Sequence, residues 1–468
     1  MSVEKQQSLE SFLNDEEKQA QISEKTSFTR YLGRLAVTLI LACLVVFMTA
    51  SPPLSAPLTI EQRVDKILSD TPLIDGHDDL PIFIRSFFNN KIYADNFTVP
   101  FTQGGLKGHV DLPRLSKGKV GGTFWSVFVQ CPKNWEDFSD ATYTTRRRIK
   151  PLDLRLTANH CLTGIRQTLE QVDLISRLAK AYPDTFSSPP NGTTALQAFL
   201  DGKIISPYGI EGLHSIGNSL ALLRDFYNLG VSYATLTHNC HNRYADAALT
   251  KQPDGSIKKA VPYWHGVSEA GKDLVYEMNR MGMIVDLAHV SVDTMRDVLG
   301  AGKDNWSGSR APVIYSHSSA YAICPHPRNV PDDVLELVKA KDSLVMVNFS
   351  PEFISCTASD HPDELPKTDM EHATLARVAD HIMHIGDLIG FDHVGLGSDF
   401  DGIMTVPRGL EDVSKFPDLI AELLRRGVSD KDAAKVAGGN LLRVWKRVDE
   451  VALQMQAEGA LPAEDNTV

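Results

Sequence analysis

Several polar residues stand directly after short apolar runs, where a strand would end. The first is in LIDGHDDLP at residues 73–81, where His77 and Asp79 follow an apolar pair. Residues two apart on an extended segment point the same way, so both side chains can face one site. Five further runs end at residues of the same chemical kind: Glu211, His238, His289, His317 and Asp399.

Five of these side chains have the chemistry of a metal site: His77, Asp79, Glu211, His289 and His317. Histidine and carboxylate ligands without thiolates suit zinc or a similar divalent ion. A single zinc takes about four ligands and often keeps one place for water, so five candidates are too many for one open site. Two metals that share a carboxylate fit better, and they could hold a hydroxide and polarise a carbonyl together. Glu211, which lies between the early pair and the late histidines, is the natural shared ligand.

Each residue has a plainer interpretation when it is taken alone. A lone histidine after an apolar run is more often a hydrogen-bonded structural residue than a ligand. His317 could open a helix that the next serines cap, and DGHDD could be a turn. The metal interpretation therefore depends on several independent strand ends with the same chemistry. Asp399 is a better candidate for a general acid/base than Asp401 because it comes first after the VGLGS run. Asp286, inside the fifth run, is a candidate to support a ligand.

A set of parallel strands would bring these residues to one place. Short apolar runs rich in Val, Ile, Leu, Tyr and Phe recur along the chain, and helical patterns lie between most of them. Strand and helix alternating eight times within about 400 residues predict an α/β fold, a closed (β/α)₈ TIM-like barrel with its catalytic groups at the carboxyl ends of the strands. An open doubly wound sheet is the alternative, but no glycine-rich phosphate loop follows the first strand. The runs are residues 71–77, 121–130, 204–212, 231–238, 281–289, 311–317, 342–350 and 393–401.

The segments outside the barrel have distinct compositions. Residues 1–34 are polar and charged and are expected to be a disordered cytosolic tail. The uncharged stretch at 35–51 is expected to be a single-pass transmembrane anchor, because basic residues precede it and its length is near the lower limit for a span. A cleaved signal peptide, which would give a secreted protein, is the alternative. A linker is expected at 52–60, the metal-dependent barrel at 61–455, and a disordered tail at 456–468.

Sequons, cysteines and charge restrict the compartment and the partners. Sequons at Asn96, Asn191 and Asn305 fit glycosylation of an extracytoplasmic domain, whereas the one at Asn348 lies in a stretch that looks buried. Of six cysteines, Cys43 lies in the expected anchor, and four of the other five can pair in an order that the sequence does not determine. A net charge of −12 without basic runs argues against nucleic acid as a partner.

The motifs around these residues resemble those of the membrane dipeptidase family, also called renal dipeptidases. The likeness extends from about residue 58 to about residue 450 and keeps the order of ten motifs. They are LIDGHDDLP, VGGTFWSVF, GIEGLHSI, TLTHNCHN, VDLAHVS, VIYSHSSAY, RNVPDD, LVMVNF, GLGSDFDG and GLEDVSKFPDLIAELLRRG. The resemblance implies a (β/α)₈ barrel with two zinc ions per chain. One ion would be held by His77, Asp79 and Glu211, and the other by Glu211, His289 and His317.

The resemblance also implies roles for three further residues. His238 matches the residue that contacts the substrate and the developing oxyanion, and Arg328 matches the arginine that orients the substrate. Asp399 matches the acid/base that protonates the departing amine. The family's disulfides correspond to Cys131 with Cys240 and Cys324 with Cys356, which leaves Cys161 free.

This chain departs from the family in four places. Asp78 stands where the motif has asparagine, and residues 135–164 look like an insertion. The mammalian relatives have a C-terminal lipid anchor, which the N-terminal segment would replace here. They also form disulfide-linked dimers, and this chain has no cysteine near its C-terminus for such a link, so a homodimer is only a possibility.

These observations predict a zinc-dependent dipeptidase with Glu211 and Asp399 as catalytic residues. A metal-bridging hydroxide would attack the peptide carbonyl, His238 would stabilise the oxyanion, and Arg328 would bind the carboxylate of a dipeptide substrate as a bidentate pair. The nearest rival is another metal-dependent amidohydrolase acting on cyclic amides, lactams or N-acyl amino acids. A more distant rival is a non-catalytic cell-surface binding protein on the same fold.

Overall fold

The computed structural model describes residues 3–50, 57–132, 154–252, 254–303, 305–361 and 363–465, without the side chains of 3–17, 20, 44–50 and 154–163. The side chain of Cys161, the first part of the expected linker and most of the expected insertion at 135–164 therefore lie outside the described part of the chain. The chain divides into two compact units, residues 1–59 and residues 60–468.

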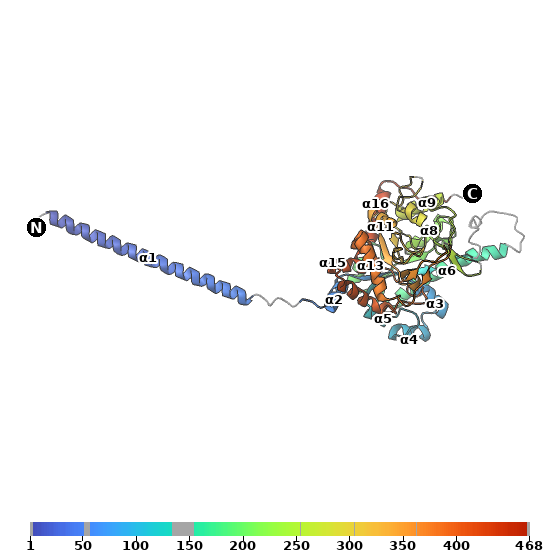
Figure 1. Cartoon of the computed structure of the whole chain (residues 1–468), viewed down its shortest axis with the longest axis horizontal. Coiled ribbons are helices and arrows are strands. Elements are labelled where there is room, and N and C mark those ends of the chain that lie inside the picture. The colour runs from blue at the N-terminus through green and yellow to red at the C-terminus, as the bar shows by residue number, and fades with distance from the viewer. Residues whose placement is uncertain are drawn as a thin grey trace. The chain divides into compact units, whose positions relative to one another are not determined.

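Eight parallel strands in the second unit form a closed barrel (Figure 1). They follow one another around the barrel in chain order, and the first strand closes against the last. The strands are β1 Leu73–Asp78, β2 Val120–Phe128, β3 Tyr208–Glu211, β4 Val231–Thr235, β7 Ile284–Asp286, β8 Ile314–Tyr315, β9 Leu344–Val347 and β12 Val394–Leu396. Each lies in one of the eight apolar runs or extends at most one residue beyond it, because a strand covered by helices outside and by the core inside needs apolar residues on both faces. The predicted (β/α)₈ barrel is confirmed.

The helices between the later strands also occur where the sequence patterns predicted them. They are α8 Leu220–Asn228, α9 Glu269–Met281, α10 Val292–Val298, α11 Asp332–Ala340 and α13 Leu375–Ile389. Three of them begin after a serine whose hydroxyl accepts a hydrogen bond from a backbone N–H of the first turn, as at Ser219, Ser268 and Ser291. Such a cap pairs one of the free N–H groups at the start of a helix.

Further elements complete the barrel unit. The other α-helices are α2 Ile60–Asp70, α3 Leu80–Phe88, α4 Asp95–Gln103, α5 Leu112–Lys117, α6 Leu154–Ala181, α7 Ala195–Leu200, α12 Pro351–Ile354, α14 Phe416–Arg425, α15 Asp430–Ala434 and α16 Asn440–Ala457. Short helical turns are η1 Leu213–Ile216, η2 Phe391–His393, η3 Val413–Lys415 and η4 Lys435–Gly439. Two small antiparallel sheets pair β5 Leu249–Lys251 with β6 Ile257–Lys259, and β10 Cys356–Thr357 with β11 Lys367–Thr368.

The amino-terminal end of the barrel is filled by α16. Trp445 of this helix packs edge-on against Phe124 of β2, with ring centroids 5.1 Å apart, in a cluster with strand residues such as Ile74 and Ile284. Gly438, just before α16, lies against Pro72 at the start of β1. Because this end is closed by apolar packing, the carboxyl ends of the strands remain for a site.

The first unit differs from the expected disordered tail at 1–34 and anchor at 35–51. Residues Val3–Ala50 form one helix, α1. This stretch has no proline and a single glycine, Gly33, and is rich in the helix formers Glu, Lys, Gln, Ala and Leu, so nothing in it ends a helix before Pro52. Among the helices in the described part of the chain, none is long and apolar enough to cross a membrane, and the expected span is not supported.

The C-terminal segment is also more ordered than expected for a disordered tail at 456–468. The Asp465 carboxylate accepts hydrogen bonds from Leu220 N at 2.8 Å and from the Ser219 hydroxyl at 3.1 Å, at the start of α8. A carboxylate at a helix N-terminus is stabilised by the helix dipole. Ala463 N donates to Glu277 at 3.0 Å. The barrel unit thus extends past 455 to at least residue 465.

Both disulfides that the resemblance implied are present, Cys131–Cys240 and Cys324–Cys356. The sequon residues Asn96, Asn191 and Asn305 are exposed, whereas Asn348 is fully buried.

Candidate active site

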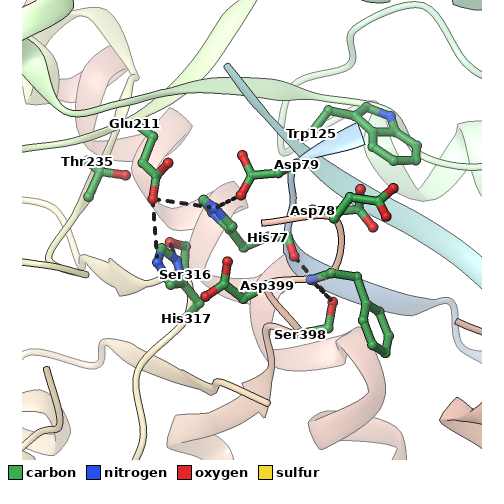
Figure 2. Close-up of polar contacts among 12 residues, drawn as sticks. His77, Asp78, Asp79, Trp125, Glu211, Thr235, Ser316, His317, Ser398 and Asp399 are labelled. Atoms are coloured by element: carbon green, nitrogen blue, oxygen red, sulfur yellow. Dashed lines mark hydrogen bonds and ion pairs between the residues drawn. The ribbon is translucent and has the colours of Figure 1, made fainter. Parts of the chain in front are cut away.

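The end of β1 brings His77 and Asp79 to the carboxyl end of the barrel. His77 Nε2 lies 3.4 Å from Asp79 Oδ2 and 3.6 Å from Glu211 Oε1, which extends from the end of β3 (Figure 2). His77 is fully buried, yet among the described residues neither of its ring nitrogens has a hydrogen-bond partner, and neither has Asp79 Oδ1. Buried polar atoms are rarely left unpaired, so these atoms indicate a missing ligand.

Glu211 also faces the ends of β7 and β8. Its Oε1 lies 3.0 Å from His289 Nε2 and 3.6 Å from His317 Nε2, and the two Nε2 atoms are 2.9 Å apart. One carboxylate oxygen therefore faces imidazole nitrogens from three strands. The structure brings together all five side chains that the sequence suggested as metal ligands.

Hydrogen bonds on the far side of two rings fix which nitrogen carries the proton. The Ser316 hydroxyl donates to Asp286 Oδ2 at 2.6 Å, so at 2.8 Å it can only accept from His317 Nδ1–H. Asn239 Oδ1 accepts from His289 Nδ1–H at 3.1 Å. Burial lowers the pKa of both histidines well below the usual value, so each ring is neutral. Each Nε2 is consequently unprotonated, and its lone pair is available to a ligand.

The donor set fits a divalent cation. His289 Nε2 and His317 Nε2, which can only accept, converge on Glu211 Oε1, and neither nitrogen carries a proton. Ligand atoms about 2.1 Å from a tetrahedral zinc lie roughly 3.4 Å apart, close to the separations seen here. Three overlapping groups have ligand atoms within 4.8 Å of one another: His77, Glu211 and His317; Glu211, His238 and His289; and His77, Asp79 and Asp399.

Asp399, after β12, lies beside this cluster. Its backbone has φ of 66°, a left-handed conformation that is unusual outside glycine, and His289 has φ of 67°. Such conformations cost of order 1–3 kcal/mol each and occur often at functional sites. Asn348 Nδ2 donates to Asp399 Oδ2 at 3.0 Å, which leaves Oδ1 for other partners. Burial raises the pKa of Asp399 to about 6, and nearby bound cations would lower this pKa again.

Arg328 reaches the same region from the segment after β8. Its side chain is buried, and its guanidinium lies over the Phe353 ring, 5.0 Å from the centroid. Nη1 donates weakly to His317 O at 3.5 Å, whereas Nε and Nη2 have no hydrogen-bond partner in the part of the chain that the structure describes. Burial lowers the pKa of Arg328 to about 10, so the group stays cationic at neutral pH. A buried cation with free donors is suited to bind an anionic group of a ligand.

His238 follows β4 on the other side of the cluster. Its ring lies 4.4 Å from that of His289 and 4.7 Å from that of Phe128. Burial lowers the pKa of His238 well below the usual value, so the ring is neutral and can donate one N–H. The Cys131–Cys240 disulfide fixes this loop to the segment that follows β2.

A cavity of about 400 Å³ opens over these residues. That volume lies within the range of small-ligand sites, and it suits a molecule of about two amino acids. Its polar floor includes Asp79, Glu211, His289, Arg328 and Asp399. Its walls include Ile82, Phe83, Phe87, Phe128, Phe353 and Ile403.

Sequence patterns missed several members of this site, among them Asp75, which accepts hydrogen bonds from the Ser398 hydroxyl at 2.5 Å and from His77 N at 3.3 Å. Asn239, which contacts His289, lies on a loop, and Phe353, which lies under Arg328, lies on the short helix α12. The strand pattern does not predict the course of either segment. Asn348 directly follows β9, but no sequence pattern indicates its contact with Asp399. Asp75 carried one available signal, because it lies two residues before His77 and so shares a side of the strand with it.

Comparisons with known proteins agree on one family. The model of "Membrane dipeptidase (Peptidase family M19)" matches residues 61–459. The chain is 44% identical over 405 residues to dipeptidase aclJ of Aspergillus oryzae, covering 86% of this chain and 84% of that protein. It is 45% identical over 398 residues to an uncharacterized dipeptidase of Schizosaccharomyces pombe, C3A11.10c, covering 84% of this chain and 85% of that protein.

Solved structures share the fold. A metallopeptidase from Rhodobacter sphaeroides, bound to a phosphinate mimic of the dipeptide L-Ala-D-Ala, has a TM-score of 0.63 at 24% identity, covering 81% of this chain and 99% of the other. The probable dipeptidase PvdM from Pseudomonas aeruginosa has a TM-score of 0.68 at 21% identity, covering 85% of this chain and all of the other.

Proposed function

This chain belongs to the membrane dipeptidase family. From that premise we propose that it is a zinc dipeptidase with two zinc ions, and that both ions share Glu211 as a ligand. Membership supports metal-dependent dipeptidase activity. The two zinc ions, their shared ligand and the roles of individual residues are the finer parts of the proposal.

One observation carries it: Glu211 Oε1 lies within 3.6 Å of His77, His289 and His317 nitrogens that come from three different strands. In a purely structural cluster, the histidine nitrogens that face one another would be joined by N–H donors and acceptors. Here the Nδ1 atoms of His289 and His317 have partners behind them, and the Nε2 atoms face one carboxylate. This is how metal-bound histidines are arranged, with a second hydrogen bond that fixes each ring.

When bound, the zinc ions would polarise the peptide carbonyl and make water a nucleophile at neutral pH. The side chains of the protein do the rest. Arg328 binds the substrate carboxylate and so places the peptide bond over the cluster. The neutral His238 donates an N–H to the carbonyl oxygen as negative charge develops on it. Asp399, with Oδ1 free, accepts a proton and delivers it to the departing amine.

The function is tested by measuring hydrolysis of a dipeptide panel, with metal content determined on the same preparation. We expect cleavage of dipeptides, loss of activity with a chelator, and recovery with added zinc. Cleavage of lactams or N-acyl amino acids but not of dipeptides would favour the amidohydrolase alternative. A protein that binds no zinc and cleaves none of these substrates would instead be a binding protein on this fold.

Replacing Arg328 with methionine is expected to raise KM for dipeptides by about 10–100-fold, because the substrate carboxylate loses a charge-assisted pair in a buried place. The matched control is the same dipeptide with its carboxylate converted to an amide. Wild-type enzyme should prefer the free acid strongly, and Arg328→Met should not. A variant that kept the full preference for the acid would show that another group recognises the carboxylate.

We also propose that the barrel unit is exported. Two disulfides and three exposed sequon residues, Asn96, Asn191 and Asn305, support this compartment. Protein from a eukaryotic host should lose mass on deglycosylation, and each Asn→Gln change at these positions should remove one increment. Asn348 is the internal control, because it is buried and should carry no glycan. An unmodified protein from a secretory host would contradict the proposal.

A further inference from the structure

Two aspartate–serine pairs beneath the site have the same geometry. In each pair, the aspartate lies on a barrel strand and faces a partner residue on the neighbouring strand. The serine comes two residues after that partner residue. Asp286 of β7 pairs with Ile314 of β8 and bonds Ser316. Asp75 of β1 pairs with Leu396 of β12 and bonds Ser398. All four polar side chains are fully buried.

The hydrogen bonds of the two pairs correspond atom by atom. Asp286 Oδ1 accepts from Ser316 N at 2.8 Å, and Oδ2 accepts from the Ser316 hydroxyl at 2.6 Å. Asp75 Oδ1 accepts from Ser398 N at 2.7 Å, and Oδ2 accepts from the Ser398 hydroxyl at 2.5 Å. Each Oδ1 also accepts from the N–H two residues ahead, at Ala288 and at His77 respectively. The same arrangement thus occurs at two places around the barrel.

Each serine immediately precedes a residue of the site, as Figure 2 shows for Ser316 with His317 and Ser398 with Asp399. The contacts beyond the serines differ. Ser316 Oγ accepts from the imidazole of His317, so this pair fixes the ring itself. Ser398 Oγ accepts from Phe400 N at 3.1 Å, so this pair fixes the backbone on both sides of Asp399, which has a strained φ. Hydroxyls held this way orient the groups that they contact.

We propose that the two pairs are positioning groups with separate tasks, an inference that rests on the proposed zinc dipeptidase function. Asp286–Ser316 holds His317 with Nε2 toward Glu211 and so sets the affinity for metal. Asp75–Ser398 holds Asp399 over the cavity and so sets the rate of proton transfer. Neither pair contacts the substrate.

The test compares Ser316→Ala and Ser398→Ala with wild type in the full chain. Zinc affinity is measured by competition with a chromophoric chelator, kcat and KM with one dipeptide, and folding by thermal melting. Ser316→Ala should weaken zinc binding by about 10–100-fold, with most of kcat restored at saturating zinc. Ser398→Ala should lower kcat by about 10–100-fold with a much smaller change in zinc affinity, because Ser398 Oγ holds the backbone beside Asp399 and contacts the ligand His77 only weakly, through its backbone oxygen at 3.4 Å.

The matched control is Ser309→Ala. Ser309 is equally buried and its hydroxyl is bonded to Ala311 O and Asn279, but it lies before β8, at the other end of the strand from the site. This variant should keep both zinc affinity and kcat. If Ser316→Ala does not fold, the isosteric Asp286→Asn breaks the same hydrogen bond from its other end and should weaken zinc binding in the same way.

The results separate the two proposals. The separate positioning roles would be overturned if Ser316→Ala and Ser398→Ala changed zinc affinity and kcat equally. They would also be overturned if either variant behaved like Ser309→Ala. If neither Ser316→Ala nor Asp286→Asn folded while Ser309→Ala did, the Asp286–Ser316 pair would be structural. That result would also overturn the separate positioning roles. A wild-type protein that neither binds zinc nor cleaves dipeptides would instead overturn the proposed function.

Discussion

Replacing Glu211 with glutamine is expected to lower kcat/KM for dipeptides by about 10³-fold or more, and bound zinc should be lost with the activity. The amide keeps the volume of the side chain but removes its negative charge. Glu211 Oε1 lies 3.6 Å or less from ring nitrogens of His77, His289 and His317. Metal stabilisation of the transition state is worth several kcal/mol, which corresponds to about 10³-fold in rate. Metal analysis and steady-state kinetics on one preparation measure both effects.

The matched control is Glu277→Gln. Glu277 is also a fully buried glutamate, but it lies on α9 and bonds Arg224, Arg280 and Ala463 N rather than the proposed metal ligands. Removing its charge should lower the melting temperature, since the charge-assisted hydrogen bonds become weaker. Zinc content and kcat should stay near wild type. A Glu211→Gln protein with full zinc and full activity would leave the shared-ligand model without support.

The barrel was predictable because its strands have a strong local signature. Each strand is a short apolar run that ends in a polar residue, and this pattern needs no knowledge of neighbours. β4 with His238 beyond its end and β12 with Asp399 beyond its end both follow it. Once the strands are parallel and closed, their carboxyl ends must meet. The proximity of His77, Glu211 and His289 therefore followed from the fold class.

The groups that hold the ligands were not predictable, because they depend on strand register. Ser398 bonds Asp75 across 323 positions of the chain, and only the pairing of Asp75 with Leu396 places them together. The contacts of loop residues such as Asn239 were equally unpredictable, because the motif TLTHNCHN does not indicate which side chain contacts His289.

The ends of the chain were difficult for another reason. The charged composition of residues 1–34 is common to disordered segments and to exposed helices, so α1 could not be distinguished from a tail. Asp465 likewise has no local signal for its contact with the start of α8.

Replacing Asp399 with asparagine is expected to lower kcat for dipeptides by about 10²–10⁴-fold while zinc content stays near wild type, because a general acid/base is removed and the proposed ligands remain. Asparagine is the informative substitution. It tolerates left-handed backbone better than most residues, so it should keep the φ of 66° at this position. It also keeps the volume of the side chain. The control Asp297→Asn removes another buried carboxylate, which accepts from Val267 N and Lys303 N in loops that do not line the cavity. That variant should lose stability but keep kcat.

A second substrate identifies the step at which Asp399 acts. The ester analogue of the same dipeptide keeps the carboxylate for Arg328, but its leaving oxygen needs protonation far less than an amine does. If Asp399 delivers the proton to the departing amine, Asp399→Asn should impair ester hydrolysis about tenfold less than peptide hydrolysis. Equal losses on both substrates would place Asp399 in an earlier step, such as activation of the attacking water. Full activity on the peptide would remove Asp399 from the mechanism and leave its strained backbone without a catalytic explanation.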